Sequence, residues 1–380
     1  KLADEDKFLI VWTTMPFTLE TDAMVGVNPK EEYVEVLVEG ETWVVGKTRL
    51  EEFMTEVKIE EYEIKRTFLG SEMEGKKYIH PLLDEIPKLA EISKQDNYHV
   101  TVAENFVDVN AGSGLVHLSP ANGEEDNNIA MKRNVTVFCP IDDEVKFTED
   151  AGKYAGLFVR DADEKLVQSV KDRNALVKIG KIKHKYPLCW RCNHGLVWLA
   201  RREYFYMLDK LGDKAIKAAE DVEYFFDQPK NRFLEIIKEK HPWCISRERY
   251  WGCPIPVWKC NDCENTEQLF SRKEIVESAI ELPDGENFEL HRPWIDKIKV
   301  KCKECSGVMQ REEFVLDTWH NSGAAPIASL DEDTYKEKIP APFFTEGIDQ
   351  TRGWAYTLLI ENVIYNNASV SPYKSFLFQG

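Results

Sequence analysis

The sequence has no apolar run long enough to cross a membrane, and its first residues lack the pattern of a secretory signal peptide. It also has no internal repeat and no low-complexity segment. These absences argue against membrane-spanning, secreted and repeat-built proteins, and we expect a cytoplasmic protein. What is present is a chain of 380 residues, 43% hydrophobic and 11% aromatic, which is long enough for two to three globular domains.

An excess of positive charge is also missing, because the formal net charge is −18. Residues 1–150 carry 15 lysines and arginines against 32 acidic residues, whereas residues 151–380 carry 34 against 35. Proteins that bind DNA depend on a basic surface. We therefore expect no DNA partner and no membrane partner, and we expect any contact with RNA to be local and to lie in the second part of the chain.

Six of the nine cysteines form three Cys-x-x-Cys pairs, a pattern typical of zinc binding in a reducing compartment rather than of disulfides. Two of the pairs are separated by 38 residues, and together they offer the four thiolates of a closed structural zinc site. The predicted ligands are Cys260, Cys263, Cys302 and Cys305.

The third pair, Cys189 and Cys192, has no partner pair in the sequence. Either its remaining ligands lie on a segment outside this chain, or its thiols are free.

The stretch from Gly112 to Asp126 contains the first candidate for catalytic chemistry. Gly112 and Gly114 allow a tight turn with room for a ligand, and a short apolar run then leads to His117. Asp126 follows at the start of a helix expected over residues 124–131, so its side chain points back toward the preceding loop. We predict that His117 and Asp126 share a pocket. The alternative is a solvated acidic helix start and a hydrogen-bonded histidine.

A second candidate follows the buried strand expected at residues 8–12. Thr13, Thr14 and Thr18 surround Pro16, which ends any strand ladder there. Hydroxyl groups at the end of a strand suit a binding loop. The alternative is that threonine simply favours strands.

The rest of the chain divides into two parts. Up to residue 184 it reads as a β-rich domain, with a hairpin at 33–45, strands at 98–103 and 115–118, edge strands at 134–138 and 154–158, and helices at 48–57 and 161–171. From residue 185 we expect an amphipathic helix at 231–240, a zinc-binding insertion at about 257–314, and a strand leading into a long helix at 343–365.

Several blocks of this sequence together resemble one family. Residues 243–256 (Trp-Cys-Ile-Ser-Arg-Glu-Arg-Tyr-Trp-Gly-Cys-Pro-Ile-Pro) resemble the class I aminoacyl-tRNA synthetases for Ile, Leu and Val, and residues 316–323 and 346–354 resemble the isoleucyl enzymes. Residues 13–18 and 112–126 are similar to the threonine-rich peptide and the histidine and aspartate loop of the editing domain in that family.

Finer features favour the isoleucyl branch. Phe17 stands where the leucyl and valyl enzymes carry an acid, and residues 342–346 (Pro-Phe-Phe-Thr-Glu) resemble archaeal or eukaryotic members. The resemblance implies an α/β protein in which a β-rich, barrel-like editing domain (1–184) is inserted in a Rossmann-like catalytic domain with zinc-binding insertions. Residues 185–380 would form the C-terminal half of that catalytic domain.

The resemblance implies an isoleucine–tRNA ligase that uses ATP and Mg, has tRNA(Ile) and isoleucine as partners, acts as a monomer, and hydrolyses mischarged Val-tRNA(Ile). Valine and isoleucine differ by one methylene, which a hydrophobic pocket separates poorly; isoleucyl-tRNA synthetase is itself the standard example of this limit. The His-Ile-Gly-His and Lys-Met-Ser-Lys-Ser motifs of the family do not occur in this sequence, so we expect editing alone from it.

The resemblance also implies roles in editing. Asp126 would bind the α-ammonium group of the amino acid, and His117 would reject the larger isoleucyl side chain. The hydroxyls of Thr13, Thr14 and Thr18 would position the ester and a water. Met15 stands where the family usually has threonine, so that hydroxyl is missing here. No Ser/His/Asp arrangement is apparent in the sequence, which favours direct attack by water.

In the catalytic half, Trp319 and Trp354 would sandwich the isoleucine side chain, with core packing as the alternative. Glu346 and Asp349 would supply negative charge for the substrate ammonium, with helix capping as the alternative for these two acids. Gln350 would be a neighbouring hydrogen-bonding group, and Gly347 belongs to the same substrate-binding block.

Two further assignments follow from the family. Arg247 and Arg249 would contact RNA, unless they form salt bridges within the fold. The Cys189 pair would be completed by a pair that precedes the editing insertion.

Other classes of protein remain as alternatives. A free-standing aminoacyl-tRNA deacylase would have no need of residues 243–354, and a non-enzymatic zinc-ribbon RNA-binding module would have no need of the editing loop. A valyl or leucyl enzyme is disfavoured by Phe17 and by residues 346–354.

Overall fold

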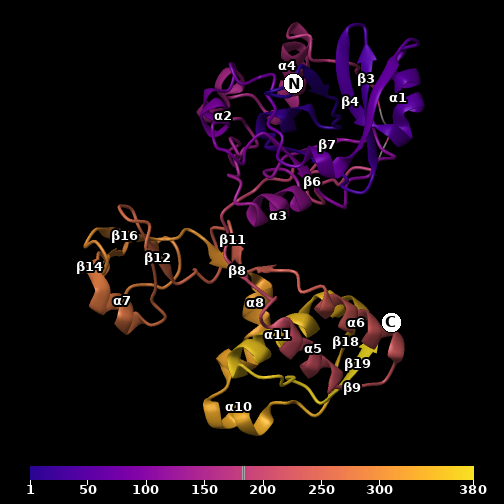
Figure 1. The fold of residues 1–380 in the computed structure, drawn as a ribbon. Helices are drawn as coiled ribbons and strands as arrows, with labels where there is room; N and C mark the ends of the chain where they lie inside the picture. The colour runs from indigo at the N-terminus through magenta and orange to yellow at the C-terminus, as the bar shows by residue number, and fades with distance from the viewer. Residues whose placement is uncertain (182, 184) are drawn as a thin grey trace. The chain divides into compact units, whose positions relative to one another are not determined.

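The computed structural model describes residues 1–181, 183 and 185–380, which divide into two compact units, Lys1–Arg201 and Arg202–Gly380 (Figure 1). The domain boundary predicted at residue 184 falls on a residue outside the described ones, and it stays a prediction. Each unit has its own hydrophobic cores.

The first sheet of unit 1 is built on a local hairpin. β3 (Glu32–Val38) and β4 (Glu41–Gly46) are antiparallel, as predicted, with β5 (Glu63–Leu69) beside β3 and β1 (Lys7–Leu9) parallel to β4. Alternate side chains of β3 point to opposite faces. Val34 and Val36 therefore pack against α1 (Leu50–Val57), whereas Tyr33 joins a second core.

The second sheet holds the candidate site. β2 (Met24–Val27) is its central strand, with β6 (Val100–Ala103) parallel on one side and β7 (Val116–Leu118) antiparallel on the other. The short 3₁₀ helix η1 (Pro16–Thr21) leads directly into β2. His117 of β7 lies opposite Val25 of β2. The register therefore brings the threonine-rich segment and the histidine loop together.

Three helices pack around this second sheet. They are α2 (Pro87–Ile92), α3 (Glu124–Lys132) and α4 (Val159–Asp172), and each contributes apolar residues to one core. α4 also fixes the threonine-rich segment, because the backbone N–H of Phe17 donates to Asp163 Oδ1 at 2.8 Å. The helices predicted at 48–57, 124–131 and 161–171 are confirmed within a few residues.

The barrel-like domain predicted from the sequence is wrong for the described part of unit 1. Its two sheets stay open, with β1 and β5 at the edges of one and β6 and β7 at the edges of the other. They meet through side chains, Val25 and Val27 with Tyr33 in one core, and through a single parallel bridge between Trp12, just after β1, and Val116 of β7. The edge strands predicted at 134–138 and 154–158 are also wrong, because short apolar runs can fill a core as loops.

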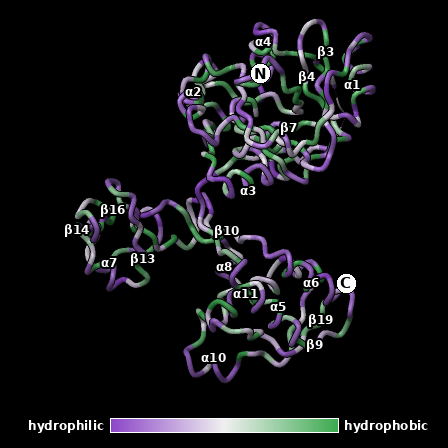
Figure 2. Tube along the Cα trace, viewed as in Figure 1, coloured by the Kyte–Doolittle hydropathy of each residue, from purple (hydrophilic) through white to green (hydrophobic). Residues whose placement is uncertain are grey.

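Unit 2 contains a parallel sheet in the order β18 (Phe344–Gly347), β19 (Ser375–Gln379), β9 (Glu223–Tyr224). A core of apolar side chains joins this sheet to α5 (Gly212–Glu220), α6 (Asp227–Lys238) and α11 (Trp354–Asn366). Of the remaining helices, α10 (Glu332–Lys338) is hydrophilic (Figure 2). The shorter helices of this unit are α8 (Thr318–Gly323) and α9 (Ala325–Ser329).

Residues 257–314 form a separate antiparallel sheet within unit 2. Its order is β13 (Thr266–Gln268), β12 (Val257–Cys260), β16 (Val308–Arg311), β15 (Lys299–Lys301), β14 (Ala279–Glu281), with α7 (Arg272–Ser278) beside it. Trp258, which is fully buried, is at the centre of its core. Two short pairs complete the unit: β8 (Phe205–Tyr206) with β10 (Trp243–Cys244), and β11 (Ser246–Arg247) with β17 (Val315–Leu316).

Among the described residues, we find no helix with the length and apolar character needed to span a membrane.

Candidate functional site

The threonine-rich segment turns at Met15, and its side chains bond to the backbone of that residue. Thr13 Oγ1 accepts from the Met15 N–H at 3.1 Å, and Thr18 Oγ1 donates to the Met15 carbonyl at 2.8 Å. The two hydroxyl oxygens lie 3.4 Å apart. Thr18 is buried and Thr14 is exposed. The structure therefore brings Thr13 and Thr18 together and leaves Thr14 at the surface.

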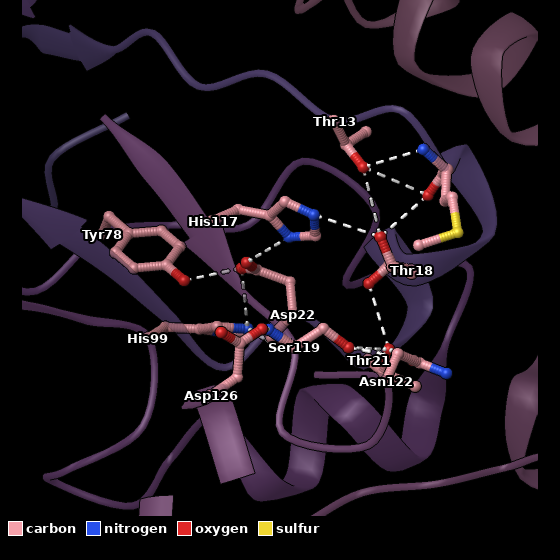
Figure 3. Close-up of polar contacts among 11 residues, drawn as sticks. Thr13, Thr18, Thr21, Asp22, Tyr78, His99, His117, Ser119, Asn122 and Asp126 are labelled. Carbon is pink, nitrogen blue, oxygen red and sulfur yellow. Dashed lines mark hydrogen bonds and ion pairs between the residues drawn. The ribbon is translucent and has the colours of Figure 1, made fainter. Parts of the chain in front are cut away.

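His117 lies between this segment and a buried carboxylate (Figure 3). Its Nε2 is 3.1 Å from Thr18 Oγ1, and its Nδ1 is 3.1 Å from Asp22 Oδ1. His117 and Asp22 are both buried. A carboxylate, an imidazole and a hydroxyl thus form a continuous hydrogen-bonded row, which was not apparent in the sequence.

Asp22 has donors on several sides. The Tyr78 hydroxyl donates to Oδ2 at 2.6 Å, and His99 Nε2 lies 3.1 Å from the Asp22 carbonyl. Burial opposes the charge of Asp22, but the hydrogen bond from His117 and the nearby histidines hold its pKa below the ordinary value. Burial also raises the pKa of Tyr78 well above its usual range, which keeps that hydroxyl a donor. Asp22 is therefore an ionised acceptor.

A second polar cluster ties η1 to the loop after β7. Thr21 Oγ1 lies 2.6 Å from Ser119 Oγ and 2.6 Å from Asn122 Oδ1. Asn122 in turn donates through Nδ2 to the Trp198 carbonyl at 2.8 Å. Because these groups are buried and mutually satisfied, they fix Thr18 and His117 relative to each other.

Asp126 lies in the first turn of α3, and its Oδ2 accepts the Ser119 N–H at 2.8 Å. The side chain is partly buried rather than open to bulk solvent. Burial raises its pKa, while the Ser119 N–H and the charge of His117 oppose that rise. Asp126 is therefore within electrostatic reach of His117, and its hydrogen-bond partner Ser119 lies two residues after His117 in the chain.

The two glycines of the histidine loop are required by close packing of the chain. A Cβ on Gly112, whose φ is +56°, would lie 2.0 Å from the Trp12 indole, and one on Gly114 would lie 2.8 Å from Gly46 Cα. The room that the sequence suggested for a ligand at Gly112 is filled by Trp12.

Sequence reasoning missed Asp22, Tyr78 and His99. A signal for Asp22 was present, because this acid directly precedes the apolar run of residues 23–27 and such a position is buried with the strand. Tyr78 and His99 come from distant segments, and nothing local marks them.

In unit 2, the predicted isoleucine block follows β18 at the carboxyl end of the parallel sheet, where ligands of open α/β sheets bind. Glu346 is partly buried near the end of β18, and Gly347 ends the strand. Gln350 donates through Nε2 to Asp349 Oδ2 at 2.8 Å and accepts the Trp354 N–H at 2.9 Å. The amide of Gln350 therefore caps the start of α11, a role that the sequence alternatives had given to the two acids.

The two predicted tryptophans lie on neighbouring helices. Trp354 donates through Nε1 to the Ser322 carbonyl at 2.8 Å and packs edge-on against Phe344, with ring centroids 5.2 Å apart. Trp319 is 44% exposed, and its ring lies close to Gly353. Trp354 is thus partly a core residue, whereas Trp319 has a free face.

The two arginines of the 243–256 block differ. The Arg247 guanidinium bonds Asp317 Oδ2 at 2.6 Å and the carbonyls of Cys244 and Ser246 at 2.8 and 2.7 Å. The Arg247 guanidinium is therefore occupied by contacts within the fold, as expected under the alternative that this arginine forms an internal salt bridge. Arg249 is exposed.

Four cysteines converge in the separate sheet of unit 2, with all their sulfur atoms within 4.8 Å of one another. Cys260 and Cys305 Sγ are 3.5 Å apart, and Cys263 and Cys302 Sγ are 3.7 Å apart. A tetrahedral zinc with bonds of about 2.3 Å needs sulfur atoms roughly 3.8 Å apart. The predicted residues therefore fit a zinc ion.

Cys189 and Cys192 lie on a tight turn, in which the Cys189 carbonyl accepts the Asn193 N–H at 2.8 Å. Within the part of the chain that the structure describes, they join no cluster of three or more metal-ligating residues.

Comparison with known proteins identifies the family. The model for "tRNA synthetases class I (I, L, M and V)" matches residues 18–380. Among curated relatives, the isoleucine–tRNA ligases of Saccharolobus islandicus, Saccharolobus solfataricus and Methanocaldococcus jannaschii are 41%, 39% and 39% identical over 99% of this chain. The chain spans 36%, 38% and 36% of those relatives.

A solved structure described as "The crystal structure of GlLeuRS-CP1" covers 47% of this chain and 85% of its own, with 14% identity and a TM-score of 0.35, which is too low to support a conclusion. The family match agrees with the resemblance of residues 243–256, 316–323 and 346–354. This chain belongs to the class I tRNA synthetases of the isoleucine, leucine, methionine and valine group.

Proposed function

We propose that this chain is part of an isoleucine–tRNA ligase and that unit 1 is its editing domain, which hydrolyses Val-tRNA(Ile). The observation that carries the proposal is the row of Thr18, His117 and Asp22, with Asp126 bonded to Ser119, two residues after His117. The names and organisms of the relatives support the amino acid and an archaeal type of enzyme.

The roles of the editing residues follow from their charge and position. Asp126 binds the α-ammonium group of the misattached valine through a charge-assisted contact. His117 limits the side chain that fits. The hydroxyls of Thr13 and Thr18 position the ester and the attacking water. Thr14, which is exposed, contacts the substrate from the mouth of the site.

In unit 2 we propose half of the isoleucine-activation site, at the carboxyl end of the parallel sheet. The free face of Trp319 and the ring of Trp354 take the apolar side chain, and Glu346 and Asp349 supply negative charge for its ammonium group. ATP and Mg are substrates of the complete ligase. We expect no amino-acid activation from residues 1–380 alone, because neither phosphate-binding motif of the family occurs in this sequence.

The four cysteines around Cys260 hold a structural zinc. All four ligands are protein groups, so no position on the metal remains for catalysis. Cys189 and Cys192 supply half of a second site, and Arg249 contacts the RNA. The enzyme acts in the cytoplasm as a monomer, and the reduced cysteine pairs suit that compartment.

The experiment that tests this function compares two variants on the first turn of α3. Asp126→Ala removes the ammonium contact, and we expect the rate of Val-tRNA(Ile) hydrolysis to fall by about 100-fold. Glu125→Ala removes an exposed acid from the same turn and should leave the rate within about twofold.

Circular dichroism checks that both variants fold. If Asp126→Ala disturbs the loop through the lost Ser119 bond, Asp126→Asn, which can still accept that bond, replaces it in the assay. Hydrolysis at the wild-type rate in a folded Asp126 variant would contradict the assignment.

A further inference from the structure

Asp22 is the one charged side chain that contacts His117 directly among the described residues, and the roles proposed above do not use it. It is 3% exposed, and its two oxygens have different partners: Oδ1 faces His117 Nδ1, and Oδ2 accepts from the Tyr78 hydroxyl. Burying an ionised carboxylate is costly unless it is hydrogen-bonded. These bonds stabilise the charge of Asp22 and also hold the ring of His117 in place.

The partners of Asp22 determine where the hydrogen of His117 lies. An ionised carboxylate only accepts hydrogen bonds, so the hydrogen between Asp22 and His117 belongs to Nδ1 of the ring. In a neutral imidazole the other nitrogen is then an acceptor. Asp22 therefore turns the free electron pair of Nε2 toward Thr18 and the threonine-rich segment.

Thr18 can give up its hydrogen bond to His117 Nε2. Its hydroxyl hydrogen has two acceptors within reach, His117 Nε2 at 3.1 Å and the Met15 carbonyl at 2.8 Å. When the hydrogen points to the carbonyl, Nε2 can exchange its Thr18 partner for a water molecule.

We propose that Asp22 is a positioning residue for hydrolysis, and that it holds His117 with Nδ1 protonated so that Nε2 serves as the general base. This inference rests on the proposed editing function. Water loses a proton to Nε2 as its oxygen bonds to the ester carbonyl carbon. The tetrahedral intermediate then expels the ribose oxygen as the ester C–O bond breaks, and Nε2 returns the same proton to that oxygen.

The surroundings of Asp22 contain other groups that it also serves. His80 and His99 stack with ring centroids 5.3 Å apart, His99 bonds the Asp22 carbonyl, and Tyr98 packs against His99. A purely structural Asp22 would hold this cluster together without affecting the ring nitrogen of His117. The test must therefore separate loss of structure from loss of the tautomer.

The experiment uses Asp22→Asn in the whole chain. The amide has the shape of the carboxylate and can still accept from Tyr78, but its NH₂ group faces His117 Nδ1 and favours the tautomer with hydrogen on Nε2. We expect kcat for Val-tRNA(Ile) hydrolysis to fall by about 100- to 10,000-fold with KM within about threefold. The matched control, Asp96→Asn at an exposed position of the same unit, should keep the wild-type kcat.

A spectroscopic measurement reads the tautomer directly. In protein labelled with ¹⁵N-histidine, the His117 signals, assigned from their loss in His117→Asn, should show a protonated Nδ1 in the wild type and a protonated Nε2 in Asp22→Asn. A wild-type ring with hydrogen on Nε2, or an Asp22→Asn variant that keeps its kcat, would overturn the inference. Absence of hydrolysis by the wild-type chain would instead refute the proposed function.

Discussion

Two buried carboxyl groups, Asp22 in unit 1 and Glu361 in unit 2, show how neighbours decide the charge of a side chain. Asp22 has Tyr78 and His117 as donors and is ionised. Glu361 lies inside α11 with no hydrogen-bond partner for Oε1 among the described residues, and burial raises its pKa to about 7. His320 Nε2 lies 3.6 Å from Glu361 Oε1, but burial lowers the pKa of His320, so this histidine does not supply a full positive charge to stabilise an ionised Glu361.

Stability should therefore depend on pH through Glu361. Its pKa is higher in the folded chain than the ordinary 4.5, so between these values the folded state binds more protons than the unfolded state. The free energy of unfolding then falls as pH rises from about 4.5 to 7, by roughly 3 kcal/mol in total. Glu361→Gln should remove this loss, as measured by urea denaturation at pH 5 and pH 8.

Glu337→Gln, which changes an exposed acid of the same unit, provides the control and should keep the wild-type dependence on pH. An equal loss of stability in Glu361→Gln and in the wild type would show that Glu361 is ionised at both pH values.

The sequence pointed to candidate residues of the site but not to their hydrogen-bond partners. Thr13, Thr18, His117 and Asp126 were singled out because polar residues at strand ends and helix starts stand out against apolar runs, and their role in a catalytic site stays a prediction. Asp22 contacts His117 directly, but its position before the apolar run of residues 23–27 indicates only that it is buried and does not reveal its partners. Which carboxylate is buried depends on contacts with Tyr78, which is distant in the chain.

At the scale of elements, local pairings were predictable and distant ones were not. The hairpin of β3 and β4 was predicted because Gly40 lies between two alternating runs. The pairing of β2 with β6 and β7 joins segments more than seventy residues apart, for which no local signal exists. The prediction of a barrel-like domain was wrong for this reason. Composition indicates that strands are present, but it does not indicate whether the sheets close into a barrel.

The proposed zinc site makes the antiparallel sheet of residues 257–314 the element whose stability should depend most on a ligand. Its strands are short, and the sulfur atoms of Cys260 and Cys305, and of Cys263 and Cys302, bring its two loops close together. Cys302→Ser should lower the zinc content, measured by release to a colorimetric chelator, by about one equivalent per chain. Cys139→Ser, at a free cysteine of unit 1, should not change it.

Chelation should also unfold residues 257–314 while Val-tRNA(Ile) hydrolysis by unit 1 continues, because structural zinc contributes directly to local folding. Unchanged zinc content in Cys302→Ser would refute the site.

At the scale of the whole molecule, the family was the most predictable property. Three blocks of unit 2 and two of unit 1 identified it, and the family model matches residues 18–380. The strongly acidic first 150 residues make a general RNA-binding surface improbable there, so recognition of the substrate must come from local contacts at the site. The two units thus carry two separate proposals, hydrolysis in one and amino-acid binding in the other.

The most direct test of the central claim is to incubate this chain with Val-tRNA(Ile) and, in parallel, with Ile-tRNA(Ile), and to follow the loss of each ester over time. The account predicts that valine is released at least about tenfold faster than isoleucine, because it assigns to His117 the exclusion of the larger side chain. Equal rates for the two esters, or no acceleration over the uncatalysed loss of valine, would contradict it.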